Sequence, residues 1–195
     1  MRCSGTVGIR VSDALRRALM KDSSPSQSAP LPEIAQILAL VNQSPGEFPD
    51  KLNLLQDTLA NGIERASLTA PDIERLEKVY EGAYALYQAQ RYREALPMAL
   101  QLAISNPKDV RFLFMAGMIL QSLGDPLLAA TFHACALQMD PTFMPAAFRM
   151  AECYTALEKD EEARALLEVS LDMGRHSDEF FELQRLIMER LAQTN

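Results

Sequence analysis

The sequence lacks the features by which secreted and membrane-spanning proteins are usually identified. No apolar run approaches the ~20 residues that a transmembrane helix needs. The N-terminal stretch MRCSGTVGIRVSDALRRALM has no continuous apolar segment of the kind found in signal peptides. The three cysteines, Cys3, Cys135 and Cys153, are widely spaced and form no CxxC pair, which argues against a disulfide framework. These absences predict a protein that stays in the cytoplasm.

Catalytic and cofactor-binding motifs are also missing. The chain has only two histidines, His133 and His176, and no GxSxG, HExxH or phosphate-binding glycine loop. His133 falls at a packing position of a predicted helix, where a buried structural histidine is expected rather than a general base. The sequence therefore predicts no enzymatic reaction, no metal site and no cofactor.

The charge balance excludes two classes of partner. The 26 acidic and 19 basic residues give a formal net charge of −7, which argues against nucleic acid or an anionic membrane surface as the main partner. With 48% hydrophobic and 23% charged residues, the composition is ordinary for a globular protein with one main domain. We expect neither nucleic-acid binding nor direct membrane insertion.

What the sequence does contain is an internal repeat with a period of 34 residues. Residues that keep this interval are Ala83, Gly117 and Ala151, then Ala95, Ala129 and Ala163, and also Pro107 and Pro141. A 34-residue period with small residues at two positions is the signature of the tetratricopeptide repeat, a helix–turn–helix unit. Small side chains are needed where the two helices of a repeat cross closely. The sequence predicts three repeats, at 76–109, 110–143 and 144–175.

The predicted fold is therefore all-α, a short right-handed solenoid of three tandem tetratricopeptide repeats within residues 76–176, with helices on both sides. Residues 1–49 are expected to form a partly disordered extension with a Ser/Pro-rich linker and a helix at 33–43. Residues 50–75 are expected to hold another amphipathic helix and a linker. Residues 177–195 carry a last amphipathic helix, which suits the polar outer face that the end of a solenoid requires.

Three tyrosines in the first repeat indicate a binding surface. Tyr80, Tyr84 and Tyr87 share one helix face, roughly 100° around the helix from the predicted core positions. In such a solenoid this face lines the concave side, and rings with a polar tip suit a groove that holds an extended peptide. The corresponding positions of the three repeats predict a peptide-binding groove lined by Tyr80, Tyr84, Tyr87, Arg111, Phe114, Met118, Gln121, Pro145, Phe148 and Glu152. A second explanation stays open, in which the tyrosines pack against helices upstream of the repeats.

Details beyond the generic repeat resemble a particular family. The stretches LEKVYEGAYALYQAQRYREAL, RFLFMAGMILQSLGDPLLAATFHACALQMDP and RMAECYTALEKDEEARALLE resemble the class II chaperones of bacterial type III secretion, over roughly residues 50–190. The resemblance implies a chaperone of the bacterial cytoplasm that works without nucleotide. Such a chaperone binds an extended N-terminal segment of hydrophobic translocator proteins in its groove, and keeps these proteins soluble, apart and competent for secretion.

The resemblance also implies partners other than the translocators. Members of this family often dimerise through the helices before the first repeat, which places a dimer contact at Leu52, Leu55, Leu59 and Ile63. They can also assist a transcriptional activator. This chain differs from the family at its N-terminal end, where it has about 45 additional residues to which no role is assigned.

Other interpretations within the interaction class remain. The chain could be a chaperone of needle or other secretion subunits, or a tetratricopeptide scaffold or regulator of secretion-gene expression. A co-chaperone that clamps the C-terminal carboxylate of another chaperone is disfavoured. Tyr84 and Met118 occupy helix positions where the polar clamp residues would be expected.

Overall fold

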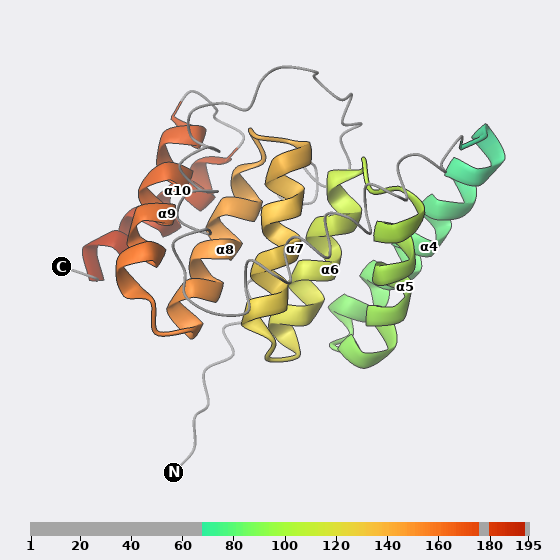
Figure 1. Cartoon of the computed structure of the whole chain (residues 1–195), viewed down its shortest axis with the longest axis horizontal. Helices are drawn as coiled ribbons and strands as arrows, with labels where there is room; N and C mark the ends of the chain where they lie inside the picture. The colour runs from blue at the N-terminus through green and yellow to red at the C-terminus, as the bar shows by residue number, and fades with distance from the viewer. Residues whose placement is uncertain (1–67, 176–179, 194–195) are drawn as a thin grey trace, which may run out of the picture.

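A computed structural model describes residues 68–175 and 180–193, which form seven α-helices and no strand (Figure 1). The helices pair in chain order: α4 (Ala70–Gln88) with α5 (Tyr92–Ser105), α6 (Val110–Ser122) with α7 (Pro126–Met139), and α8 (Met144–Ala156) with α9 (Asp160–Gly174), followed by α10 (Phe181–Gln193). The all-α prediction is confirmed for this part of the chain. The helix expected at 33–43 and the predicted dimer residues Leu52, Leu55, Leu59 and Ile63 lie outside the described residues.

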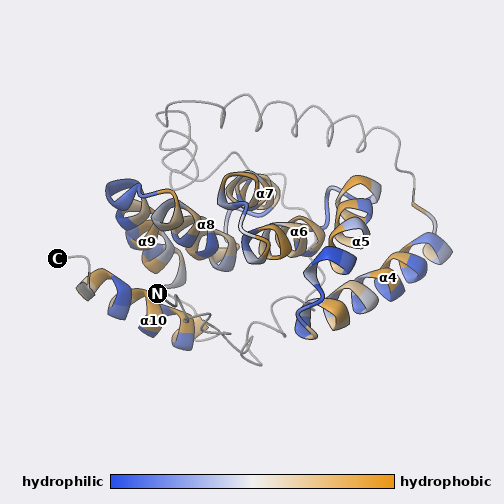
Figure 2. Cartoon of the chain, turned by 90° about the horizontal axis from the view of Figure 1, so that it is seen from below, coloured by the Kyte–Doolittle hydropathy of each residue, from blue (hydrophilic) through white to orange (hydrophobic). Residues whose placement is uncertain are grey.

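The three pairs stand side by side as successive units of a solenoid (Figure 1). Seen from the direction of Figure 2, the helices form an arc with α4 and α10 at its two ends, on the same side. Helices α6 and α8 begin at Val110 and Met144, the residues where the second and third repeats were predicted to start. None of the helices in the described ranges is both long enough and apolar enough to cross a bilayer.

The crossing of the two helices in each pair depends on small residues. Ala83, Ala95, Ala129, Ala151 and Ala163 are all at most 3% exposed. Gly117 of α6 faces the imidazole of His133 on α7, and a Cβ added to Gly117 would lie 2.5 Å from His133 Cε1. A gap this narrow admits no methyl group, which explains the glycine at the middle one of the three equivalent positions.

The turn between the two helices has the same backbone geometry in all three pairs. Gln90, Gly124 and Glu158, spaced 34 residues apart, have φ values of 60°, 85° and 59°. The amide of the following residue donates to a carbonyl five residues back: Arg91 to Leu86, Asp125 to Leu120, and Lys159 to Tyr154. This is the hydrogen bond of a left-handed helix end, which favours glycine. Only the second repeat has glycine there, so Gln90 and Glu158 adopt a strained conformation.

The last helix closes the end of the solenoid. Ile187 of α10 is fully buried, and the Gln184 side-chain amide donates to the Gly174 carbonyl at 2.5 Å. Glu182, Arg185 and Glu189 on the same helix are exposed. The polar outer face predicted for a terminal helix is therefore present on α10.

Replacing Glu158 by glycine should raise the free energy of unfolding by about 0.5–1 kcal/mol, because glycine adopts the left-handed conformation without steric cost. Urea denaturation measures the change. Glu158→Ala is the matched control, since it removes the same charge but keeps a Cβ, and it should give no gain. Equal gains in both variants would assign the effect to charge and contradict the backbone explanation.

His133 provides a second prediction, on pH. Its side chain is fully buried, neither ring nitrogen has a hydrogen-bond partner among the described residues, and burial, assisted by Arg149, lowers its pKa from 6.5 to about 3. Between these values the unfolded chain binds a proton that the folded chain excludes, so stability should fall as the pH drops below 6.5. The loss from this group is up to roughly 1.4 kcal/mol per pH unit.

Urea titrations of the wild type and of His133→Leu at several pH values between 7 and 4 test this expectation. The leucine variant has no group to protonate at this position, so its stability should depend less steeply on pH. Parallel curves for the two proteins would show that His133 does not contribute to acid sensitivity.

Candidate functional site

The predicted groove residues come from α4, α6 and α8, the first helix of each pair, but most of them are covered. Seven of the ten are buried: Tyr80, Tyr84, Arg111, Phe114, Met118, Pro145 and Phe148. The other three, Tyr87, Gln121 and Glu152, are half-buried. A peptide could reach the buried side chains only after whatever covers them moves, so the groove assignment stays a prediction.

The aromatic end of the predicted groove lies between α4 and α6. The ring of Tyr80 lies 5.6 Å from that of Phe112 and 6.5 Å from that of Tyr84, measured between centroids. Tyr80 is 1% exposed, whereas the adjacent Val79 is only half-buried. Tyr80 is buried more deeply than Val79 because its ring fills the space against α6.

The Tyr80 hydroxyl is an unusual feature of this cluster. It is buried and has no hydrogen-bond partner among the described residues, and burial raises its pKa above the ordinary value of 10.0. A buried hydroxyl without a partner costs free energy. Its presence is therefore not explained by the stability of the helix pair.

Arg111 fastens the first pair of helices to the second. Its Nη2 lies 2.5 Å from Glu77 Oε1 and 2.5 Å from Asp109 Oδ2, and its guanidinium lies 5.4 Å from the centre of the Tyr80 ring. Burial by itself lowers its pKa, but the hydrogen bonds with Asp109 and Glu77 outweigh this effect and raise it. Sequence reasoning placed Arg111 beside the groove but did not identify Glu77 as its partner. The two residues occupy equivalent positions of adjacent repeats, 34 residues apart, and carry opposite charges, which is the signal that could have found the pair.

Phe114 lies on the side of α6 toward α7 and α8. Its ring centroid is 5.3 Å from that of His133 and 5.1 Å from that of Phe143, the second contact being edge-to-face. The side chain is fully buried. Phe114 therefore contributes to the packing of the second and third repeats, whatever it contributes to binding.

A cleft is present at the other end of the predicted groove. It has a volume of about 250 Å³, is open on one side, and is lined by Gln121, Phe148, Ala151, Glu152, Thr155, Ala156, Leu167 and Arg190. Gln121, Phe148 and Glu152 are thus brought together as predicted neighbours, whereas Tyr80, Tyr84 and Tyr87 are not part of it. Sequence reasoning missed Leu167 and Arg190, since no local pattern relates α9 and α10 to α8.

The cleft combines an apolar wall with a charged rim. Glu152 Oε2 lies 2.7 Å from Arg149 Nη1 and accepts a hydrogen bond from Gln121 Nε2 at 3.3 Å, and Glu152 Oε1 lies 4.0 Å from Arg190 Nη2. Phe148, Ala151 and Leu167 supply the apolar part. The cleft is smaller than the roughly 300–1,000 Å³ of typical small-molecule pockets. It suits one or two amino-acid side chains better than a cofactor.

Substituting Tyr80 by phenylalanine tests the unpartnered hydroxyl. The variant keeps the ring contacts and removes a buried polar group, so its free energy of unfolding should be unchanged or higher by up to about 1 kcal/mol. Urea denaturation decides this. A loss of more than 1 kcal/mol would show that the hydroxyl has a stabilising partner.

Comparison with known proteins defines the class of the fold. A family model described as tetratricopeptide repeat matches residues 120–187. Together with the helix pairs and their 34-residue spacing, this match identifies the solenoid as tetratricopeptide repeats. Comparison with curated protein sequences gives no significant match.

Solved structures with the same fold are more specific. The type III secretion translocator chaperone SycD of Yersinia enterocolitica, in an alternative dimer, is 26% identical with a TM-score of 0.61, over 62% of this chain and 92% of SycD. SycD in complex with a peptide of the translocator YopD matches with the same identity, TM-score and coverage. PcrH from Pseudomonas aeruginosa has a TM-score of 0.61 at 21% identity, over 66% of this chain and 95% of PcrH, and bears on the fold alone.

The two SycD structures confirm the resemblance to translocator chaperones of type III secretion that the sequence indicated. SycD is described as a chaperone, which agrees with the expectation that the chain is not an enzyme. They do not test which residues of this chain would contact a partner.

Proposed function

We propose that this protein is a chaperone of a bacterial type III secretion system. It binds an extended segment of a hydrophobic translocator protein on the concave side of its solenoid, and thereby keeps translocators soluble and apart until secretion. The observation that carries the proposal is the match to SycD, described both in an alternative dimer and in complex with a translocator peptide, over 92% of its length.

The cleft between α8 and α10 offers a suitable contact for such a segment. An apolar side chain that enters it would meet Phe148, Ala151 and Leu167, and burying one such side chain contributes about 2 kcal/mol. An extended segment also brings unpaired backbone amides and carbonyls. The Gln121 amide and the Thr155 hydroxyl at the cleft can pair with them.

The buried tyrosine cluster gives a second contact at the α4 end. The Tyr80 hydroxyl has no partner among the described residues, and a backbone carbonyl of a bound segment would accept its hydrogen bond. Rearrangement of the side chains that cover Tyr80 and Tyr84 is part of this proposal, because both are buried in the free chain. The role of these rings is then to pack when the groove is empty and to bind when it is filled.

Self-association accompanies this function. SycD is described in an alternative dimer, and we propose that this chain also forms homodimers. Assistance to a transcriptional activator is a further role proposed from the family resemblance.

Co-purification tests the function. The chain is expressed together with the hydrophobic secreted proteins encoded beside it, and each is assayed for solubility and for retention on the tagged chaperone. We expect at least one protein with transmembrane segments to become soluble and to stay bound through its N-terminal region. A well-folded chain that retains none of them would refute the translocator assignment.

Thr155→Arg tests the cleft within the same assay. Thr155 is exposed at the cleft, so arginine would obstruct it without entering the core, and retention of the translocator should fall at least ~10-fold, equivalent to about 1.4 kcal/mol. Gln101→Arg is the matched control, since Gln101 is exposed on α5 and the charge changes equally. Equal retention by both variants would exclude the cleft as the binding site.

A further inference from the structure

Helix α7 is buried on every side. All nine residues from Ala129 to Leu137 are at most 4% exposed. Nine consecutive residues make two and a half turns, so their side chains point in all directions around the axis. A helix that is buried all round needs neighbours all round.

The described helices cover only part of α7. It packs mainly against α6 and α8, and the contact of His133 with Gly117 shows which face is turned to α6. Thr131 and Cys135 lie two residues to either side of His133, roughly 160° around the helix from it. They are 0% and 1% exposed although they face away from α6, and in Figure 2 no other labelled helix lies beyond α7 on that side.

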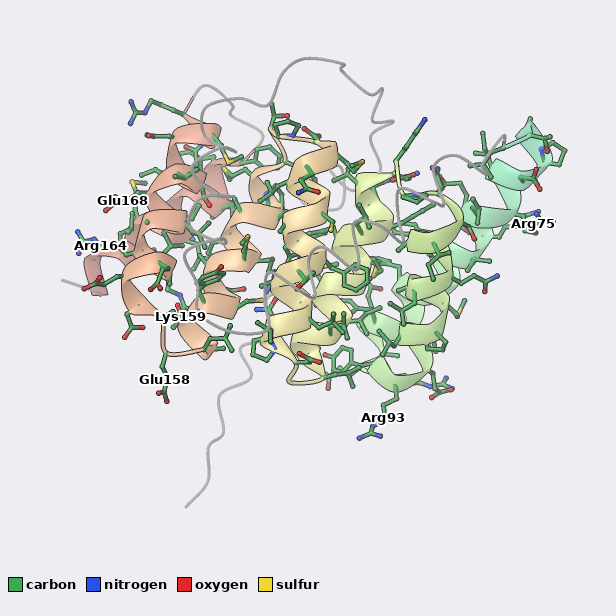
Figure 3. The ribbon with its side chains drawn as sticks, in the orientation of Figure 1. Arg75, Arg93, Glu158, Lys159, Arg164 and Glu168 are labelled. Atoms are coloured by element: carbon green, nitrogen blue, oxygen red, sulfur yellow. The ribbon has the colours of Figure 1, made fainter. Side chains whose placement is uncertain are left out.

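The small size of Thr131 and Cys135 does not account for their burial. Ala85 on α4 and Ala156 on α8 have smaller side chains, and both are exposed. The outer faces of the equivalent helices also differ in chemistry. Arg93 on α5 and Glu168 on α9 are exposed, and Arg93, Arg164 and Glu168 lie at the margin of the molecule in Figure 3. Helix α7 has no charged residue from Pro126 to Met139.

We propose that the outer face of α7 is covered by a segment of the same chain, residues 52–63, packed on it as a helix. This segment carries an apolar stripe formed by Leu52, Leu55, Leu59 and Ile63. An apolar stripe of this kind can pack against the outer face of α7, which has no charged side chain. The surface defined by Thr131, Ala134 and Cys135 is its docking site. Leu55 and Leu59 are then intramolecular packing residues in the monomer.

The length of the connection permits this arrangement. Five residue steps separate Ile63 from Leu68, and they span at most roughly 18 Å when extended. A 12-residue helix adds about 18 Å. Leu68 lies just before α4, and α7 is three helices further along the chain. At about 8–10 Å between neighbouring helices this is at most roughly 30 Å, so α7 is within reach. The apolar stretch at 33–43 is separated from Leu68 by a much longer connection, whose closure costs more entropy.

Cys135 is a natural reporter of the cover. In full-length protein with Cys3→Ser and Cys153→Ala, the reaction of Cys135 with a small thiol reagent measures access to the outer face of α7. Leu55→Glu with Leu59→Glu should accelerate this reaction at least ~10-fold, because charged side chains would detach the segment. The matched control is Ile37→Glu with Leu38→Glu, the same change on the other apolar stretch, which should leave the rate unchanged.

A second thiol separates local uncovering from global unfolding. Cys153 of α8 is also fully buried, so the background Cys3→Ser with Cys135→Ala reports opening of the whole fold. The proposal requires that the glutamate pair accelerate labelling of Cys135 but not of Cys153. Equal acceleration of both thiols, or none at Cys135, would overturn it, as would acceleration by the control pair instead.

The remaining alternative is that a second copy of the chain covers α7. In that case the Cys135 labelling rate of the otherwise unsubstituted protein would rise on dilution, in step with dissociation measured by light scattering. A rate independent of concentration is expected here. Because no translocator is present in this experiment, its outcome does not depend on the proposed chaperone function.

Discussion

The close crossing of two helices at small residues is the interaction on which the rest of this structure depends. In each pair an alanine or glycine of the first helix and an alanine of the second allow the backbones to approach, and the approach recurs every 34 residues. Gly117 is the tightest case, since the imidazole of His133 occupies the space of its missing Cβ. The repeat of this contact produces an arc of parallel pairs, and the arc creates a concave side.

Two polar networks join successive pairs from the same side of the arc. Arg111 connects α6 to Glu77 of α4 at one end, and Glu152 connects α8 to Gln121 of α6 and to Arg149 at the other. Buried charges need partners of this kind, and Arg111 and Glu152 each find one on the preceding repeat.

The middle pair differs from its neighbours in what surrounds it. Helices α6 and α7 are buried along nearly their whole length, while α4, α9 and α10 each keep an exposed polar face. A short solenoid buries its middle unit best, but the burial of α7 on the side away from α6 goes beyond what its described neighbours provide. The unpartnered hydroxyl of Tyr80 raises a similar question on the concave side. Contacts with segments or partners outside the repeats would account for both features.

The sequence by itself determined the repeat, the all-α fold and the positions where α6 and α8 begin, because helix crossing imposes small residues at a fixed interval that can be read along the chain. It also identified the family resemblance through the aromatic triplet and the stretches around it. Only the tertiary structure decided that Tyr80 and Phe114 are buried, that Arg111 is an inter-repeat clamp, and that Leu167 and Arg190 join Phe148 in one cleft. Those facts depend on which helices pack against one another in the arc. The periodicity of a single helix does not reveal how deeply neighbouring elements bury each of its faces.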